Sequence, residues 1–266
     1  MMKKYDLIFS LGANCSAAHN LRFRGLRPFA LPFDWTFIKD EKALLSFARG
    51  LDDHFAEFTR LENFCKLGED EFSPNHADRV QYKNTRTGYY FVNHFNKEIG
   101  PAEADFGTLK KRFARLEKYL EQAGSICVII CSSFFISDDT AQEVLEALRR
   151  KYPDKDVDVV ILNFSCPEET QERMEGLTIS RYARATNDYD FHKTNIEWSF
   201  MDGFRLSGKL SAPPNVCTAK TPETRPVHRD TEPYENIAQS EMLSVRTAAG
   251  PHYRQTEKNL RLRIGK

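Results

Sequence analysis

The sequence predicts an α/β fold in which helices cover both faces of a mainly parallel sheet, with an antiparallel hairpin added to it. Short apolar segments alternate with longer segments of helical periodicity, and strands separated by helices usually pair in parallel. Two of these segments, SICVIICSSFF at 125–135 and VDVVILNFS at 157–165, have the composition of buried strands. The segment RVQYKNTRTGYYFVNHF at 79–95 predicts the hairpin, because two strand-like runs flank a turn that contains Gly88.

The N-terminal elements are predicted from turn and capping residues. A strand is expected over 5–11 and ends at the turn formed by Gly12. A helix is expected over 16–24, with Gly25 as its C-terminal glycine. The segment PFALPFDWTFI at 28–38 is apolar but contains two prolines, so it is expected to be irregular.

The later elements are predicted mainly from periodicity. An apolar stripe predicts a helix over 104–122. The helix expected over 138–151 would have Asp138 or Asp139 as its N-cap. The other predicted elements are a helix over 41–58, a short proline-initiated helix over 167–174, a strand over 177–184 and a last helix over 195–204.

Composition and charge narrow the class of protein. The chain of 266 residues has 38 Lys and Arg against 38 Asp and Glu, so we expect no general attraction to nucleic acid or to an anionic membrane. No apolar run approaches the roughly 20 residues of a membrane span, and the N-terminus is a poor signal peptide. The sequence therefore predicts a cytoplasmic protein with reduced cysteines.

The chain is expected to form one catalytic-type domain followed by a tail. Residues 1–210 contain all the predicted strands and helices. Residues 211–266 hold half of the prolines and few large apolar residues, so they lack the material for a core of their own. We expect this tail to be disordered or loosely packed.

Cys15 is the first candidate for chemistry, because it stands where the first strand becomes the first helix. Free N–H groups and the positive end of the helix dipole stabilise a thiolate there and lower its pKa. The same N–H groups, including that of Ser16, and the amide of Asn14 could hold an oxyanion. The other interpretation is that Cys15 is a small apolar side chain buried in the core. No cysteine spacing supports a metal site, and Cys127 and Cys131 are expected to be buried filler.

A thiolate nucleophile needs a base, most often an imidazole within hydrogen-bond reach. His94 ends an apolar strand, where its side chain can project from the sheet edge into a cleft. His192 lies beside Asp188 and Asp190, just before the last predicted helix. His19 lies one helical turn after the cysteine, and the sequence leaves open whether it faces that cysteine or solvent.

Other residues suggest substrate binding. Arg22, Arg24 and Arg27 lie close together and could bind a carboxylate or phosphate, or form a solvated helix face. Asp34, in apolar surroundings beside Trp35, could orient a catalytic imidazole or cap a turn. The chain has no dinucleotide, P-loop, zinc-hydrolase or serine-elbow motif, so neither a nucleotide cofactor nor a catalytic metal is expected.

The stretch SLGANCSAAHNLRFRGLRPFALPFDW, residues 10–35, resembles the opening signature of a bacterial family described as papain-like cysteine peptidases. The signature runs Ser-Leu-Gly, two residues, Cys, a helix with Leu-Arg, then Gly-Leu-Arg and Pro-Phe-Asp-Trp. The family also has a downstream His-Asp-Phe-like motif, to which NHFN at 93–96 is similar, although the acid is missing. The resemblance weakens beyond about residue 165.

This resemblance implies a thiol hydrolase or acyl transferase that acts without a cofactor on a peptide-like or glycan-linked small substrate. It also implies a papain-like α+β fold as the alternative to the three-layer sheet. Cys15 would be the nucleophile, His94 the base, and Asp34 the residue that orients the site. Substrate would be bound by Arg22, Arg27 and Trp35.

Two other functions stay open. A non-catalytic module would bind an anionic glycan or a phosphorylated ligand through the arginines at 22, 24 and 27. A GDSL-like esterase with cysteine in place of serine would also place its nucleophile after the first strand. Because its histidine comes late in the chain, that reading favours His192 with Asp188 or Asp190.

Overall fold

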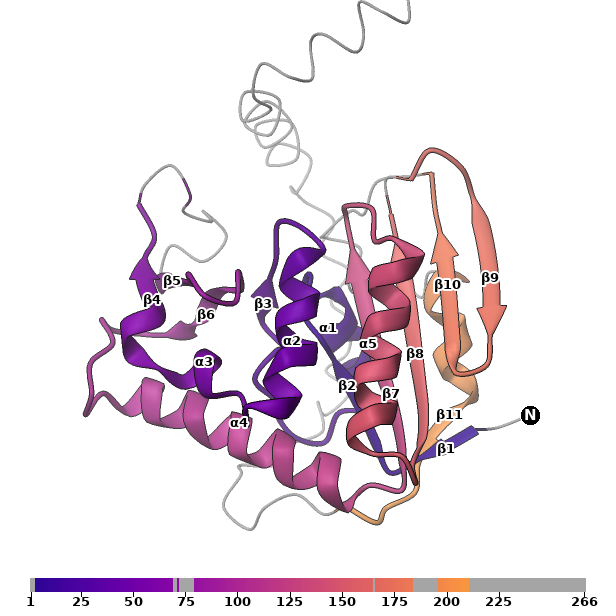
Figure 1. Ribbon diagram of the computed structural model, residues 1–266, viewed down its shortest axis with the longest axis horizontal. Coiled ribbons are helices and arrows are strands. Elements are labelled where there is room, and N and C mark those ends of the chain that lie inside the picture. The colour runs from indigo at the N-terminus through magenta and orange to yellow at the C-terminus, as the bar shows by residue number, and fades with distance from the viewer. Residues whose placement is uncertain (1–2, 69–70, 72–78, 165, 184–195, 211–266) are drawn as a thin grey trace, which may run out of the picture. The chain divides into compact units, whose positions relative to one another are not determined.

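The main sheet in our computed structural model has five strands in the order β2-β7-β8-β10-β9 (Figure 1). The structure describes residues 3–68, 71, 79–164, 166–183 and 196–210. The parallel strands are β2 (Leu7–Ser10), β7 (Ser125–Ser132), β8 (Asp156–Asn163) and β10 (Leu177–Arg181). The edge strand β9 (Thr170–Met174) is antiparallel to β10.

Helices cover both faces of this sheet. Val128 and Ile130 of β7 join a large core with α2 (Lys42–Asp52), α4 (Ala104–Gln122) and α5 (Asp138–Lys151). Ile129, between them, points to the other face and packs with α1 (Ser16–Phe23) and the 3₁₀ helix η5 (Ile196–Gly203). Side chains of successive strand residues point to opposite faces, so these two clusters lie on opposite sides of β7. The predicted mainly parallel, helix-covered α/β fold is confirmed.

A second sheet extends the predicted hairpin. It has the order β3-β6-β5-β4, and all its pairings are antiparallel. Its strands are β3 (Thr36–Phe37), β4 (Phe64–Lys66), β5 (Val80–Asn84) and β6 (Tyr90–Phe95). The turn between β5 and β6 contains Gly88, which has a φ of +77° and donates its N–H to the Asn84 carbonyl at 2.9 Å. Figure 1 shows this sheet beside the parallel one, with α3 (Ala56–Thr59) and α4 close to it.

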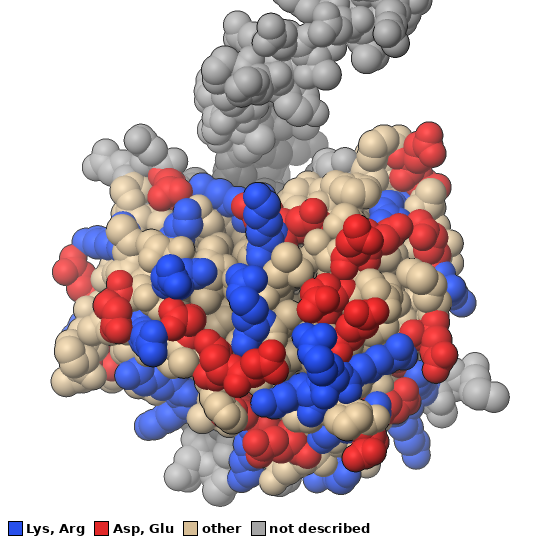
Figure 2. Space-filling view, in the orientation of Figure 1, with Lys and Arg blue, Asp and Glu red and all other residues tan. Residues whose placement is uncertain are grey.

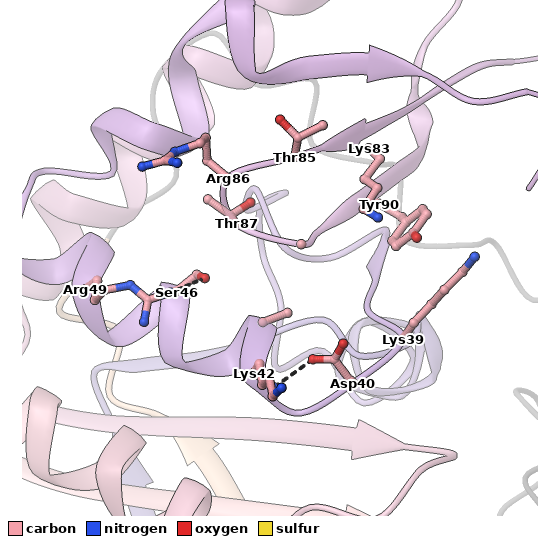
Figure 3. Close-up of a pocket in the computed structure, with 12 residues that line it drawn as sticks. Lys39, Asp40, Lys42, Ser46, Arg49, Lys83, Thr85, Arg86, Thr87 and Tyr90 are labelled. Carbon is pink, nitrogen blue, oxygen red and sulfur yellow. Dashed lines mark hydrogen bonds between the residues drawn. The ribbon is translucent and has the colours of Figure 1, made fainter.

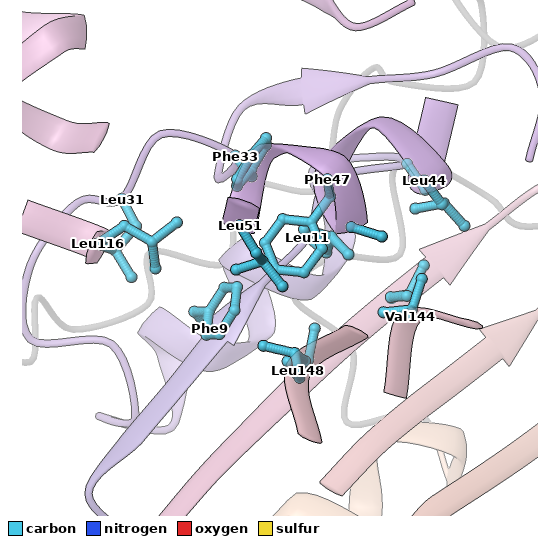
Figure 4. Packing of buried hydrophobic residues seen from close by; sticks show 14 of the residues in the cluster. Phe9, Leu11, Leu31, Phe33, Leu44, Phe47, Leu51, Leu116, Val144 and Leu148 are labelled. Atoms are coloured by element: carbon cyan, nitrogen blue, oxygen red, sulfur yellow. The ribbon is translucent and has the colours of Figure 1, made fainter. Parts of the chain in front are cut away.

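Phe33 is a centre of the large core (Figure 4). Its side chain is fully buried, and its ring lies 5.1–6.2 Å, between centroids, from five other aromatic rings. These rings belong to Phe47, Phe55, Phe58, Tyr89 and Phe113. Phe33 therefore joins α2, α3, the hairpin and α4 through aromatic packing, which adds to the free energy of burial.

The helix expected over 41–58 is divided. α2 ends at Asp52, and His54 and Phe55 then adopt left-handed backbone with φ of 57° and 54°. The Phe55 N–H donates to the Gly50 carbonyl at 2.8 Å, and the Phe55 ring lies where a Cβ on Gly50 would stand. Gly50 thus lets the aromatic side chain fold back over the end of α2, and the chain continues in a new direction as α3.

The helix predicted over 167–174 is wrong, since residues 170–174 form the edge strand β9. A turn at Gly176, with a φ of +76°, brings β9 back to pair along β10, and this pairing outweighs the proline-initiated helix signal. The N-cap of α5 is Ser137, one residue before the expected aspartates, and its Oγ accepts from the Thr140 N–H at 3.3 Å. The last predicted helix is a 3₁₀ helix.

The first predicted strand is also divided, at Asp6. β1 (Lys3–Tyr5) pairs in parallel with β11 (Phe204–Leu206), whereas β2 pairs with β7. Asp6 lies between the two and accepts the Gly124 N–H at 2.7 Å. Residues 211–266, like His192, Asp188 and Asp190, lie outside the described residues, so the tail stays a prediction. None of the described helices has the length and apolar character to cross a membrane.

Candidate functional site

Cys15 lies at the carboxyl end of β2, directly before α1. The chain reverses there through Gly12 and Ala13, whose φ angles are +81° and +71°. Gly12 is required, because a Cβ would lie 2.4 Å from the Thr36 hydroxyl oxygen. Left-handed backbone is uncommon for alanine, and such conformations cluster at functional sites. The turn presents a half-buried Cys15 side chain at the N-cap of α1.

Asn14 binds this turn to the neighbouring strand. Its Oδ1 accepts the Ser16 N–H at 2.9 Å, and its Nδ2 donates to the Cys131 Sγ at 3.5 Å. The Ser16 N–H considered for an oxyanion is therefore used inside the turn. The Asn14 amide carries two hydrogens, so it retains a second one for another acceptor.

The carboxyl ends of the four parallel strands meet at the edge where Cys15 lies. Ligands of open parallel sheets bind outside this edge. Several polar groups on it are already engaged within the protein: Asn163 accepts the Ile136 N–H at 2.7 Å, and Arg181 pairs with Asp138 and Glu172. Of the described cysteines, Cys127, Cys131 and Cys166 are buried and Cys65 is exposed on β4. Cys15 is thus the described thiol that is both accessible and placed at a helix start.

His94 lies in a different environment from Cys15. Its Nε2 donates to the Pro32 carbonyl at 3.0 Å, and its ring packs against Phe91 and Phe95. Burial and the nearby Arg112 guanidinium lower the pKa of His94 to about 3. Among the described residues its ring contacts do not include Cys15, and a ring of such low pKa is a weak base near neutral pH.

Asp34 is fully buried and paired with Arg27. The Leu31 N–H also donates to its Oδ2 at 2.6 Å, while Oδ1 has no hydrogen-bond partner among the described residues. Neither oxygen is hydrogen-bonded to His94. The structure therefore gives Asp34 a place in a buried ion pair and does not bring it to Cys15.

The three arginines considered for anion binding do not converge. Arg24 pairs with Asp202 at 3.1 Å, whereas the guanidinium of Arg27 is occupied by its buried carboxylate and lies 5.4 Å from the centroid of the Trp35 ring. Arg22 is exposed near the end of α1. Two of the three guanidinium groups are therefore already paired with carboxylates of the protein.

His19 lies one helical turn after Cys15, on α1. It is half-buried, and its backbone N–H donates to the Cys15 carbonyl at 3.0 Å, as the first turn of a helix requires. Residues four apart on a helix lie on one face, about 6 Å between Cβ atoms. His54 is exposed and paired with Glu117. The i, i+4 spacing from Cys15 is the sequence signal that makes His19 a candidate base.

Acidification is expected to destabilise the protein through His94. Its pKa is about 3 in the folded protein and about 6.5 in an unfolded chain, so between these values the unfolded state binds more protons. The free energy of unfolding therefore falls as the pH falls from 6.5 toward 3, by about 2–3 kcal/mol at two units below 6.5. Urea unfolding of the wild type at about pH 7.5 and about pH 4.5 measures this loss.

The control for this prediction is His94→Gln, which keeps an N–H donor for the Pro32 carbonyl but does not titrate. The variant is expected to lose about 2–3 kcal/mol less than the wild type over the same pH change. An equal loss in both proteins would show that other groups cause the acid sensitivity.

A cavity of about 350 Å³ lies apart from these residues, between the start of α2 and the β5–β6 turn (Figure 3). Cationic side chains from two segments more than thirty residues apart line it, from Lys39 to Arg86, which is why no sequence pattern reveals it. Within the described part of the chain, no group of three or more His, Cys, Asp or Glu side chains is arranged to hold a metal ion.

Comparison with protein families identifies a family to which the chain is similar. A family model described as "Putative papain-like cysteine peptidase" matches residues 6–166. This range includes β2, the Cys15 turn, the whole antiparallel sheet and the parallel strands β7 and β8. No curated protein and no solved structure matches the chain.

Proposed function

The chain belongs to the family described as papain-like cysteine peptidases, and on that premise we propose that it is a thiol hydrolase or acyl transferase with Cys15 as its nucleophile. The observation that carries the proposal is the strained turn at Gly12 and Ala13, which presents an accessible thiol at the N-cap of a helix. The substrate we propose is peptide-like or a small glycan-linked molecule.

The reaction would proceed through a thioester. The Cys15 sulfur forms a bond to the carbonyl carbon of the substrate while a base takes the thiol proton. The bond to the leaving amine or alkoxide then breaks, and the protonated base returns the proton to that group. Water, or an acceptor amine or hydroxyl in a transferase, releases the acyl group from sulfur and regenerates the thiol.

The start of α1 would stabilise the charges that develop. The positive end of the helix dipole favours the thiolate, and the first N–H groups of a helix have no partner within it. Asn14 directly precedes Cys15 in the chain. Its side-chain amide would donate its second hydrogen to the oxyanion of the tetrahedral intermediate. Removing such a donor typically lowers kcat by about 10²–10³.

We propose His19 as the base, since the i, i+4 spacing on α1 supports a contact between its imidazole and Cys15. His94 is a weaker candidate because its ring donates to the Pro32 carbonyl and has a pKa near 3. His192, which lies outside the described residues, is the alternative that a GDSL-like arrangement favours. His19→Ala is expected to lower kcat by about 10²–10⁴, the usual contribution of a general base.

The experiment that tests the nucleophile is alkylation by iodoacetamide at neutral pH, followed by peptide mass spectrometry and by turnover of an ester substrate. Cys15 is expected to react faster than Cys65, because both are accessible but only Cys15 begins a helix. Cys15→Ala is expected to abolish turnover, whereas the matched control Cys65→Ala keeps it. Turnover that survives Cys15→Ala would refute the proposal.

The same turnover assay distinguishes the roles of the histidines. His19→Ala and His192→Ala distinguish the two possible bases, because only replacement of the true base lowers kcat while leaving the stability of the fold unchanged. His94→Gln is expected to retain turnover. A loss of turnover in His94→Gln, with the fold intact, would restore His94 as the base.

A further inference from the structure

The cavity beside α2 concentrates positive charge in a chain whose net charge is zero. Five cations and one carboxylate line it, which gives a local formal charge of five minus one, or +4. The cations are Lys39, Lys42, Arg49, Lys83 and Arg86, and the carboxylate is Asp40. In Figure 2, basic side chains form a column down the middle of this face, over α2.

Only some of these cations form ion pairs. Lys39 pairs with Glu71 at 3.2 Å, and Arg86 pairs with the half-buried Glu57 at 3.7 Å. Within the described ranges, Lys42, Lys83 and Arg49 form no ion pair with a carboxylate, although Glu71 lies near Lys83 and Glu41 near Lys42. Arg49 donates to the Ser46 hydroxyl at 2.8 Å. The cavity therefore keeps three cations that form no direct ion pair among the described residues.

Thr87 is a buried polar residue in the wall of the same cavity. It is only 4 % exposed, and its hydroxyl has no hydrogen-bond partner among the described residues. Its backbone N–H is satisfied by the Asn84 side chain at 3.0 Å, so the turn itself does not need the hydroxyl. In Figure 3 the hydroxyl oxygen lies on the inner side of the ring of lining residues. A buried hydroxyl without a partner is costly, which suggests that a ligand oxygen accepts from it.

Neighbouring groups would add to the attraction for an anion. The cavity lies at the first turn of α2, the positive end of the helix dipole. Asp40, the one carboxylate, accepts the Lys42 N–H at 2.9 Å, so it faces the helix start. Ser46 and Thr85 supply further hydroxyls.

We propose that this cavity binds the phosphate group of a phosphorylated small molecule. A phosphate has close to two negative charges and several acceptor oxygens, which match the cations and hydroxyls better than the single charge of a carboxylate does. The volume of about 350 Å³ is that of a small-molecule site. A long polyanion would need a wider basic surface, whereas acidic side chains lie on both sides of the basic column in Figure 2. The site does not depend on the chemistry proposed for Cys15.

The test is calorimetric titration and thermal unfolding of the full chain with inorganic phosphate, against sodium chloride at equal ionic strength. Phosphate is expected to raise the Tm more than chloride does. The double variant Lys42→Gln with Lys83→Gln is expected to lose this difference, whereas Lys118→Gln, an exposed lysine on α4, keeps it. Equal effects of phosphate and chloride on the wild type would overturn the proposal, as would phosphate binding that survives the double variant.

The Thr87→Val variant tests whether the Thr87 hydroxyl binds the ligand or stabilises the fold. Valine has nearly the same shape, so the Tm without phosphate is expected to be unchanged or higher, while the affinity for phosphate falls at least about fivefold. A lower Tm without phosphate, together with unchanged phosphate affinity, would overturn this role. Cys15→Ala is expected to bind phosphate as the wild type does, so the failure of one proposal is distinguishable from that of the other.

The source of the phosphate is identified by two further probes. Glucose 6-phosphate represents a soluble ester, and phosphatidylcholine vesicles that contain phosphatidic acid represent a lipid headgroup. Because the cavity has the size of a single small molecule, we expect displacement of phosphate by the soluble ester. Sedimentation with the vesicles that is lost in the double variant, without binding of the ester, would overturn the small-molecule assignment.

Discussion

Replacing Asp34 by alanine is expected to destabilise the protein by about 3–5 kcal/mol, because it leaves the buried Arg27 without its counter-charge. The side chain of Arg27 is 8 % exposed and that of Asp34 is fully buried, so water cannot replace the lost partner. Arg112 lies close enough to interact with the same carboxylate, which means that the variant also leaves two like charges near each other. Urea unfolding at neutral pH measures the effect.

A double variant identifies the cause. Asp34→Ala with Arg27→Met removes both charges and keeps apolar volume, so it is expected to recover at least about 2 kcal/mol of the loss. If the double variant were no more stable than Asp34→Ala alone, the carboxylate would be stabilising the Leu31 turn rather than the ion pair.

The same residue tests the orienting role that the family resemblance implies. Asp34→Asn keeps the shape of the side chain, and Asp34 makes no hydrogen bond to His94 within the described structure. At a temperature where the variant is folded, its kcat for an ester is expected to equal that of the wild type. A lowered kcat with an intact fold would show that Asp34 acts on the catalytic site.

Replacing Phe33 by alanine is expected to have the second large effect, a loss of about 3–5 kcal/mol in the free energy of unfolding. The ring is fully buried among five aromatic neighbours that belong to different elements, so they cannot all move inward to fill the cavity. Thermal and urea unfolding measure the loss. Phe23→Ala is the matched control: its side chain is 60 % exposed, and the expected change is within about 0.5 kcal/mol.

Both of these residues belong to the Pro-Phe-Asp-Trp segment at 32–35. The Pro32 carbonyl accepts from His94, Phe33 fills the core, and Asp34 pairs with Arg27, over which Trp35 packs. Each of the four residues thus has a structural role.

The sequence by itself predicted the elements whose signals are local. The apolar stripe of 104–122 and the amphipathic pattern of 138–151 give helices with the observed bounds, because a helix buries one face whatever its partner is. The turn, thiol and helix around Cys15 are likewise encoded within a few residues. Cys127 and Cys131 are buried as expected, because they belong to a continuously apolar strand, and Cys131 also accepts from Asn14.

Only the tertiary structure decided the features that depend on distant partners. β9 is a strand because β10 pairs with it, and α2 ends early because Phe55 packs over Gly50. Arg27 and His94 are bound to Asp34 and Pro32, and the phosphate cavity joins side chains of α2 to those of the hairpin turn. Periodicity and capping residues indicate which face of a segment is buried and where the segment ends, whereas ion pairs and cavities depend on which segments pack together.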